Sequence, residues 1–228
     1  MIIPPIDPKT EGIVATAKAL VSYVPIFGPL LSEVGNLYLN PLDRRKQQWM
    51  EDVSNAINTI TVQHLIEPKD LEHNERFIST LYRATTCALM THQREKHEAL
   101  KHALIASVDG KRLPQDTINQ FLRYIDELTV THFALLSALA ANHAKLSEVK
   151  SLKQLYELLV TSDGIPLERL MFRQFMRDLD SRSLIKLGDI EEFPEYKSTV
   201  TFLSDTASRP APTEFTSVGH AFLNFVSA

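Results

Sequence analysis

The longest run of apolar positions lies near the N-terminus, over residues 12–39, where only one lysine and one glutamate interrupt the hydrophobic pattern. Pro25, Gly28 and Pro29 lie in the middle of this run. Because proline removes a backbone donor and clashes with the preceding turn of a helix, a single straight helix is disfavoured. The pattern therefore predicts two short helices joined by a bend, which together form a hydrophobic helical hairpin.

The second arm of this hairpin is predicted to be amphipathic, because its apolar residues recur at helical spacing. Its apolar face consists of Leu30, Leu31, Val34, Leu37 and Tyr38. Before the hairpin, residues 1–11 contain three prolines and no basic stretch ahead of an apolar core. This segment lacks the pattern of a secretory signal and is expected to be an extended N-terminal arm.

Three longer helices are predicted next, because apolar residues recur at a spacing near 3.6 over residues 43–66, about 71–108, and 114–128. Pro68 ends the first of these, and Asp109-Gly110 closes the second. The third has the clearest stripe, made of Ile118, Phe121, Leu122, Ile125 and Leu128. Together with the hairpin, these helices are expected to form an antiparallel bundle.

The pattern becomes shorter after Thr129, which is a predicted helix N-cap. Helices are expected over residues 133–141, 152–160, 167–183 and 217–226, with a helix-turn-helix spacing among the first three. Two runs that favour strands, residues 184–187 and 199–203, predict a β-hairpin wing across a charged loop, and residues 207–215 form a linker.

We therefore expect a mainly α fold, with a helical bundle, an N-terminal hydrophobic helical hairpin and a C-terminal winged-helix-like α/β module. The predicted domains are residues 1–40 for the arm and hairpin, 41–128 for the bundle and 129–228 for the winged-helix-like module. The scarcity of glycine, with seven among 228 residues, also favours helices over a turn-rich β architecture.

Charge and cysteine content restrict the classes of function. The formal net charge is −4, so no global positive field attracts the whole protein to nucleic acid or anionic lipid. The single cysteine, Cys87, excludes an internal disulfide and any multi-cysteine metal site, which fits a reducing compartment. A cytoplasmic location is predicted, extended to peripheral association at the inner membrane if the hairpin reaches lipid.

A basic cluster directly follows the hydrophobic hairpin. Arg44, Arg45 and Lys46 lie at the start of a predicted helix, where cations oppose the helix dipole by about 0.3–1 kcal/mol each. Their placement favours an anionic partner, such as lipid phosphate, with Trp49 at the level of the headgroups. One alternative is that the hairpin packs against the bundle while carboxylates such as Glu51 and Asp52 pair with the three cations. Another is a constitutive transmembrane span, which the prolines and the two charges of the hairpin disfavour.

No catalytic residue, cofactor or metal site is expected. Cys87 has no aligned base or electropositive setting in the sequence, and the glycine-loop, GxSxG and HExxH motifs are absent. His92, His97 and His102 follow each other at five-residue steps, which turn the rings to different sides of a helix. Solvated or capping histidines are therefore expected.

A second basic pattern lies in the predicted recognition helix. Arg169, Arg173 and Arg177 fall at i, i+4 and i+8 and form one stripe, which suits a DNA backbone or major groove. The wing loop opposes this reading, because its acidic side chains would repel phosphate. Its acids are Asp189, Glu191, Glu192 and Glu195. Winged helices also serve as modules for protein docking or dimerisation.

Three stretches of the chain resemble the bacterial abortive-infection alpha (Abi-alpha) family and its uncharacterised relatives. They are VPIFGPLLSEVGNLYLNPLDRRKQQWMEDV, NERFISTLYRATTCALMTHQREKHEAL, and FTSVGHAFLNFV after a DLDSRSLI element. The resemblance implies an association with phage defence, in a protein that halts or kills its own cell upon infection. It transfers no catalytic residue.

The leading hypothesis is a non-enzymatic defence protein whose bundle shelters the hydrophobic hairpin until a trigger releases it toward the inner membrane. One alternative is a winged-helix DNA-binding regulator that uses the stripe of Arg169, Arg173 and Arg177. Another is an oligomeric scaffold or adaptor that self-associates, or binds a partner protein, through the amphipathic arm over residues 30–39.

Overall fold

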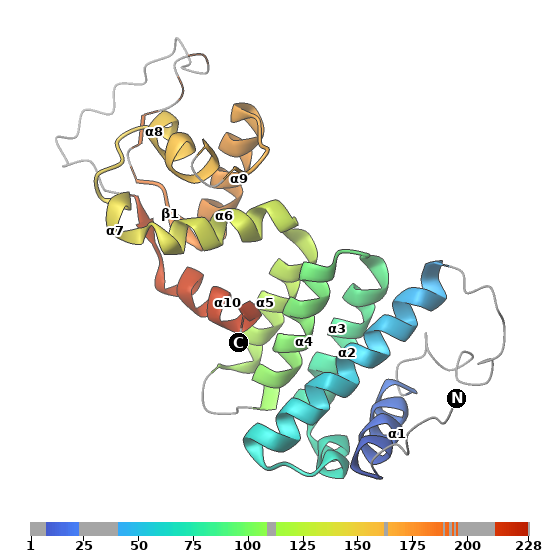
Figure 1. Cartoon of the computed structure of the whole chain (residues 1–228). Helices are drawn as coiled ribbons and strands as arrows, with labels where there is room; N and C mark the ends of the chain where they lie inside the picture. Colours follow the sequence, from blue (N-terminus) through green and yellow to red (C-terminus); the bar gives the residue numbers. More distant parts are fainter. Residues whose placement is uncertain are drawn as a thin grey trace. The chain divides into compact units, whose positions relative to one another are not determined.

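Most of the described residues are helical, and two short strands form the only sheet among them (Figure 1). The computed structural model describes residues 8–22, 41–108, 113–161, 164–188, 190–191, 193, 195 and 213–227. The predicted second arm of the hairpin and the predicted strand over residues 199–203 lie outside these ranges. The chain divides into unit 1, Met1–Glu127 with Phe225–Ala228, and unit 2, Leu128–Asn224.

Unit 1 is a bundle of helices that follow one another up and down (Figure 1). Its elements are α1 (Pro8–Ser22), α2 (Pro41–His64), the 3₁₀ helix η2 (Pro68–His73), α3 (Glu75–Met90), α4 (Arg94–Val108) and α5 (Gln115–Glu127). The ribbon shows α2 and α4 running in the same direction, with α3 antiparallel to both. The predicted helical bundle is confirmed.

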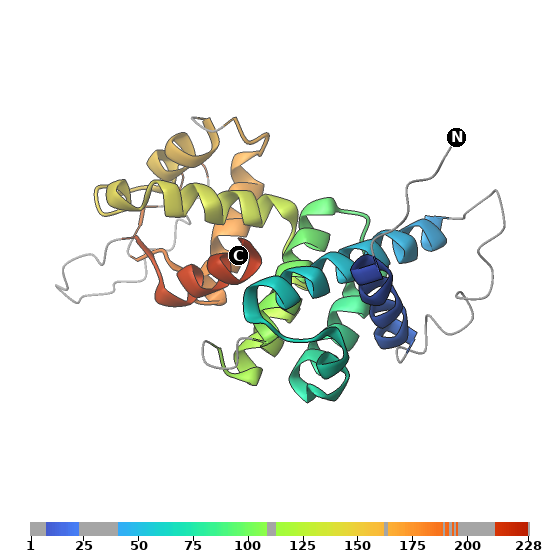
Figure 2. The ribbon, with the colours of Figure 1, turned by 60° about the horizontal axis from the view of Figure 1, so that its bottom comes forward.

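The start of α1 differs from the predicted extended arm, because this helix already begins at Pro8. Proline suits the first position of a helix, where its missing N–H is not needed, and Glu11 in the first turn complements the helix dipole. Helix α1 buries Ala17 and Leu20 and packs on α2 and α3 (Figure 2). The extended-arm prediction is therefore wrong for residues 8–11.

The core of unit 1 follows the predicted apolar stripes. In α5, the side chains of Ile118, Phe121, Leu122 and Ile125 are buried, as the sequence pattern indicated. The largest fully buried side chains of the other helices are Leu20, Trp49, Ile57, Ile60, Leu71, Phe77, Leu81 and Leu100. Burying a large apolar side chain contributes about 1.5–3 kcal/mol, so these stripes decide which helix faces turn inward.

The single helix predicted over residues 71–108 is wrong, because the structure interrupts it twice. Asn74 caps α3, with its side-chain oxygen accepting a hydrogen bond from the N–H of Phe77 at 3.1 Å. Thr91 is extended, with φ −113° and ψ 153°, and its hydroxyl accepts from the N–H of Gln93 at 3.1 Å. Both side chains compete with helical backbone hydrogen bonds, which makes them good breakpoints.

Unit 2 contains shorter helices, as predicted. Its elements are α6 (Val130–Ala141), α7 (His143–Leu146), α8 (Leu152–Tyr156), the π-helical turn η3 (Glu157–Thr161), α9 (Arg169–Ser181), strands β1 (Ile185–Lys186) and β2 (Glu214–Phe215), and most of α10 (Ser217–Ser227). Thr129 is the N-cap of α6, which confirms that prediction. Its backbone N–H donates to Nδ1 of His132 at 3.1 Å.

The sheet of unit 2 contains a strand that the sequence pattern did not predict. Strand β1 pairs antiparallel with β2, so that Ile185 lies opposite Phe215. Glu214 and Phe215 were expected in a linker, and this assignment is wrong. The hydroxyl of Thr213 donates to the carbonyl of Leu187 at 2.9 Å, and Phe215 is buried. Tertiary contacts thus determine a strand too short to leave a sequence pattern.

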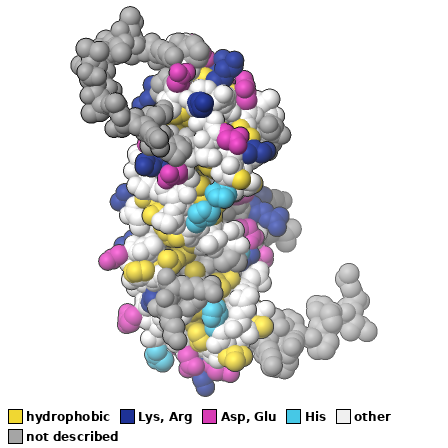
Figure 3. All heavy atoms as spheres, turned by 90° about the vertical axis from the view of Figure 1, so that its left-hand side faces the viewer, with side chains coloured by type: hydrophobic (Ala, Val, Ile, Leu, Met, Phe, Trp, Pro, Cys, Tyr) yellow, Lys and Arg dark blue, Asp and Glu magenta, His cyan; other side chains and the backbone are white. Residues whose placement is uncertain are grey.

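Surface charges are interspersed on the face drawn in Figure 3, where neither basic nor acidic side chains dominate. Among the described residues, none of the helices combines the length and the apolar character that crossing a bilayer requires.

Candidate anion-binding groove

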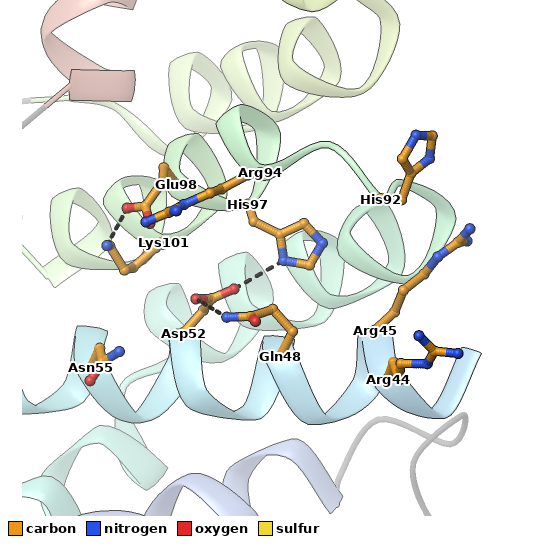
Figure 4. A pocket seen from close by; sticks show the side chains of 10 residues that line it. All are labelled: Arg44, Arg45, Gln48, Asp52, Asn55, His92, Arg94, His97, Glu98 and Lys101. Atoms are coloured by element: carbon orange, nitrogen blue, oxygen red, sulfur yellow. Dashed lines mark hydrogen bonds and ion pairs between the residues drawn. The ribbon is translucent and has the colours of Figure 1, made fainter. Parts of the chain in front are cut away.

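A groove of about 560 Å³ lies between α2 and α4 in unit 1 (Figure 4). It is lined by Arg44, Arg45, Gln48, Asp52, Asn55, His92, Arg94, His97, Glu98 and Lys101. Half of these residues come from α2, four from α4, and His92 from the short connection before α4. The volume falls in the range of about 300–1,000 Å³ that is typical of sites for small molecules.

Helical spacing explains why these side chains share the groove. On α2, Arg44, Gln48, Asp52 and Asn55 follow at steps of four, four and three residues, which keeps them on one face. The groove residues of α4, from Arg94 to Lys101, lie at i, i+3, i+4 and i+7. Because α2 and α4 are neighbours, the two polar faces meet along the groove.

The floor of the groove is a buried pair of ionisable side chains. Asp52 and His97 are 6% and 5% exposed, and Nδ1 of His97 lies 3.0 Å from Oδ2 of Asp52. The other carboxylate oxygen of Asp52 accepts from the amide of Gln48 at 3.3 Å. The ring of Trp49 meets that of His97 edge-on at 6.0 Å. These contacts fix both side chains, so His97 is not the solvated or capping histidine expected from the sequence.

The rim of the groove is mainly cationic. Arg45 donates to the carbonyl of Leu89 at 3.1 Å, close to the end of α3, where a cation suits the helix dipole. Arg44 is exposed and forms no ion pair with any described residue. Lys101 pairs with Glu98.

The balance of charge in the groove is positive. Four arginine and lysine side chains face two carboxylates, which gives a formal net charge of +2 with both histidines neutral. The whole chain carries −4. Both carboxylates of the groove already have partners, Asp52 in His97 and Glu98 in Lys101. The groove therefore offers cations to a ligand without an equal number of unengaged carboxylates.

The predicted basic cluster is divided by the structure. Arg44 and Arg45 line the groove, whereas Lys46 is 7% exposed and does not line it. Trp49 is fully buried, and its indole N–H donates to the hydroxyl of Thr85 at 2.9 Å. Trp49 therefore belongs to the core and does not lie at a surface. The five apolar residues predicted for the second hairpin arm, Leu30, Leu31, Val34, Leu37 and Tyr38, lie outside the described residues.

The second basic pattern, on α9, is already engaged at one end. Arg169 pairs with Glu195 at 3.0 Å, and its guanidinium lies 6.0 Å from the ring centre of Tyr156. A backbone hydrogen bond and the bond from Arg169 lower the pKa of Glu195. Arg173 is half-buried and Arg177 is exposed. Arg169 is thus held by an acid of the predicted wing loop.

Comparison with known proteins gives no relative for the chain. No family model matches it, no curated protein matches it, and no solved structure matches it. The resemblance to the Abi-alpha family therefore stays a prediction.

Other reactive side chains do not form a second site among the described residues. Burial, followed by the charge of Asp126, raises the pKa of the Cys87 thiol to about 11. Nδ1 of His102 lies 2.8 Å from the carbonyl oxygen of Val226, at the end of α10. No group of three or more histidine, cysteine, aspartate or glutamate side chains is placed to hold a metal ion in the described ranges.

Sequence reasoning identified Arg44 and Arg45 but missed the residues that face them from α4. Arg94, His97 and Lys101 have the spacing of a helix face, and this signal was available in the sequence. Asp52 was considered only as a partner for the basic cluster. Which helix lies beside α2 depends on tertiary packing, and a single sequence does not carry that information.

Proposed function

We propose that this chain is a non-enzymatic protein that recognises an anionic, phosphate-bearing partner through the groove between α2 and α4. The observation that carries the proposal is the unequal charge of the groove, where both carboxylates have internal partners and Arg44 forms no ion pair with a described residue. Arginine presents a planar fork of donors that matches the oxygens of phosphate. A phosphate at this site would offset the unfavourable placement of Arg44 at the start of α2.

Within this proposal, the partner is an anionic membrane surface and the biological role is phage defence of the abortive-infection type. Arg44 and Arg45 directly follow the apolar segment over residues 12–39, and apolar segments that end in cations suit lipid interfaces. Each arginine or lysine near an anionic bilayer contributes about 1 kcal/mol to the free energy of membrane binding. The resemblance to the Abi-alpha family supports the role in defence.

The groove chemistry supports binding over catalysis. A general base must reach a substrate proton, but Asp52 and His97 are buried and paired with each other. A nucleophilic cysteine needs a thiolate, and the pKa of Cys87 is raised. The pair of Asp52 and His97 joins α2 to α4, and the arginines of the groove are the groups that contact the ligand.

Co-flotation of the full chain with vesicles tests the proposal. Binding to vesicles that contain phosphatidylglycerol is expected at low salt and should weaken at high salt, because salt screens exposed charges. Arg44→Glu combined with Arg45→Glu should abolish it. The matched control is Lys69→Glu combined with Arg83→Glu, which changes the net charge equally at exposed positions outside the groove. Equal binding by both double variants would remove the groove from the proposal.

The role in defence has its own test. Overexpression in a bacterial host should slow growth, and Val34→Asp combined with Leu37→Ser should relieve this effect if the apolar segment acts on a membrane. Circular dichroism of the purified variant checks that it is folded. Unrelieved toxicity in a folded variant would separate the defence role from the apolar segment.

A further inference from the structure

The cations of the groove form two groups at its opposite ends. Figure 4 shows Arg44, Arg45 and His92 at one end, while Arg94 and Lys101 lie together at the other. Along α2, the groove extends from Arg44 to Asn55, which corresponds to about 16 Å of helix at 1.5 Å per residue. In Figure 4, Arg44 and Arg45 point away from the middle of the groove, so one phosphate group is too small to contact both ends.

The stretch between the two groups is polar and closed below. The buried pair of Asp52 and His97 forms its floor, and the amides of Gln48 and Asn55 border it. An apolar ligand would remove the exposed amides of Gln48 and Asn55 from water without replacing those hydrogen bonds, which is costly. A chain of phosphates keeps negative charge along its length and has acceptor oxygens throughout.

We infer that the groove binds a soluble ligand with a chain of linked phosphates, whose charged groups contact Arg44 and Arg45 at one end and Arg94 and Lys101 at the other. One consequence of this inference, competition with a membrane, rests on the proposed function. Since the ligand and a membrane surface both use Arg44 and Arg45, the ligand competes with anionic vesicles and so regulates membrane binding.

Substitution of Glu98 should increase the affinity for the ligand, whereas a general loss of folding could only decrease it. It pairs with Lys101 at the second end of the groove, so a phosphate that binds Lys101 lies close to a carboxylate. The neutral variant Glu98→Gln removes this repulsion. It should bind the phosphate chain several-fold more tightly than the original chain does.

Isothermal titration calorimetry of the full chain with inorganic tripolyphosphate, and separately with orthophosphate, tests the inference. Tripolyphosphate should bind at least tenfold more tightly than orthophosphate. Arg44→Gln and Lys101→Gln should each weaken tripolyphosphate binding about tenfold, since each removes one charged contact. The matched control, Arg83→Gln, removes an exposed arginine outside the groove and should leave the affinity within twofold.

The outcomes separate this inference from the proposed function. Equal affinity for the two probes, or equal weakening by Arg83→Gln, overturns the phosphate-chain ligand even if vesicles still bind. Tripolyphosphate binding with the expected response to Arg44→Gln, but without vesicle binding, supports the ligand and overturns the membrane proposal. When both bind, tripolyphosphate should displace the chain from vesicles, and simultaneous binding of both overturns the competition.

Discussion

At the scale of single residues, the groove depends on a set of buried polar side chains at and below its floor. The ring of Trp49 meets that of His97 edge-on, and its indole N–H donates to the hydroxyl of Thr85 on α3. His97 in turn pairs with Asp52. Each of these groups is buried, so each requires its partner. The positions of the exposed arginines are therefore set by a polar network inside the bundle.

Thr85→Val should destabilise the protein by about 1–3 kcal/mol, because it leaves the buried indole N–H of Trp49 without its acceptor. The matched control is Thr86→Val, at a less buried position whose hydroxyl only bonds back within α3. It should change the free energy of unfolding by less than about 0.5 kcal/mol. Urea titration followed by the fluorescence of the single tryptophan measures both. Equal costs would show that the indole bond contributes nothing.

Cys87 should react slowly with iodoacetamide at pH 8. With a pKa of about 11, only about one thiol in a thousand is ionised at this pH, and the thiolate is the nucleophile. Because the raised pKa favours the protonated form, the rate should increase as pH rises toward 11. Asp126→Asn should accelerate the reaction by removing a nearby negative charge, whereas Glu72→Gln, on η2, should not. Rapid alkylation of the folded chain at pH 8 would contradict this assignment.

At the scale of elements, the sequence predicts a helix well where an apolar stripe decides its buried face. The stripe of α5 and the cap of α6 at Thr129 are examples, and both are confirmed. The break between α3 and α4 was missed, because apolar residues continue on both sides of it. A hydrogen bond from Gln93 to Thr91 turns the chain there, and one local bond leaves no periodic signal.

Two helical glycines should respond oppositely to the same substitution. Gly12, in α1, has no atom within 4 Å of an added methyl group, so Gly12→Ala should stabilise the protein by about 0.5–1 kcal/mol through helix propensity. At Gly219, in α10, the methyl carbon would lie 2.1 Å from the carbonyl oxygen of Leu184. Gly219→Ala should therefore cost about 1–3 kcal/mol.

The close approach at Gly219 also explains how β1 is held in unit 2. The hydroxyl of Thr216 donates to the carbonyl of Leu184 at 2.9 Å, and the N–H of Gly219 donates to that hydroxyl at 2.9 Å. Urea midpoints of the two alanine variants should move in opposite directions. A Gly219→Ala midpoint at or above that of the original chain would show that α10 shifts away from Leu184 without cost.

At the scale of the whole molecule, a net charge of −4 conceals a local positive site. The placement of Arg44 and Arg45 against the dipole of α2 was readable in the sequence and indicated an anionic partner. Arg94 and Lys101 were not linked to them, because their meeting depends on α2 and α4 being neighbours. The residues that distinguish a groove from an exposed basic cluster could therefore not be derived from spacing alone.

Hydrogen–deuterium exchange with and without tripolyphosphate should map the ligand to this one site. Binding stabilises the segments it joins, so exchange should slow in α2 and at the start of α4. Exchange in α9 should stay unchanged, although its stripe of Arg169, Arg173 and Arg177 offers the other basic pattern of the chain. Arg169 is already paired with Glu195, so it should bind a second anion less tightly. Protection of α9 with none in α2 would transfer anion binding to unit 2 and favour the winged-helix alternative over the groove.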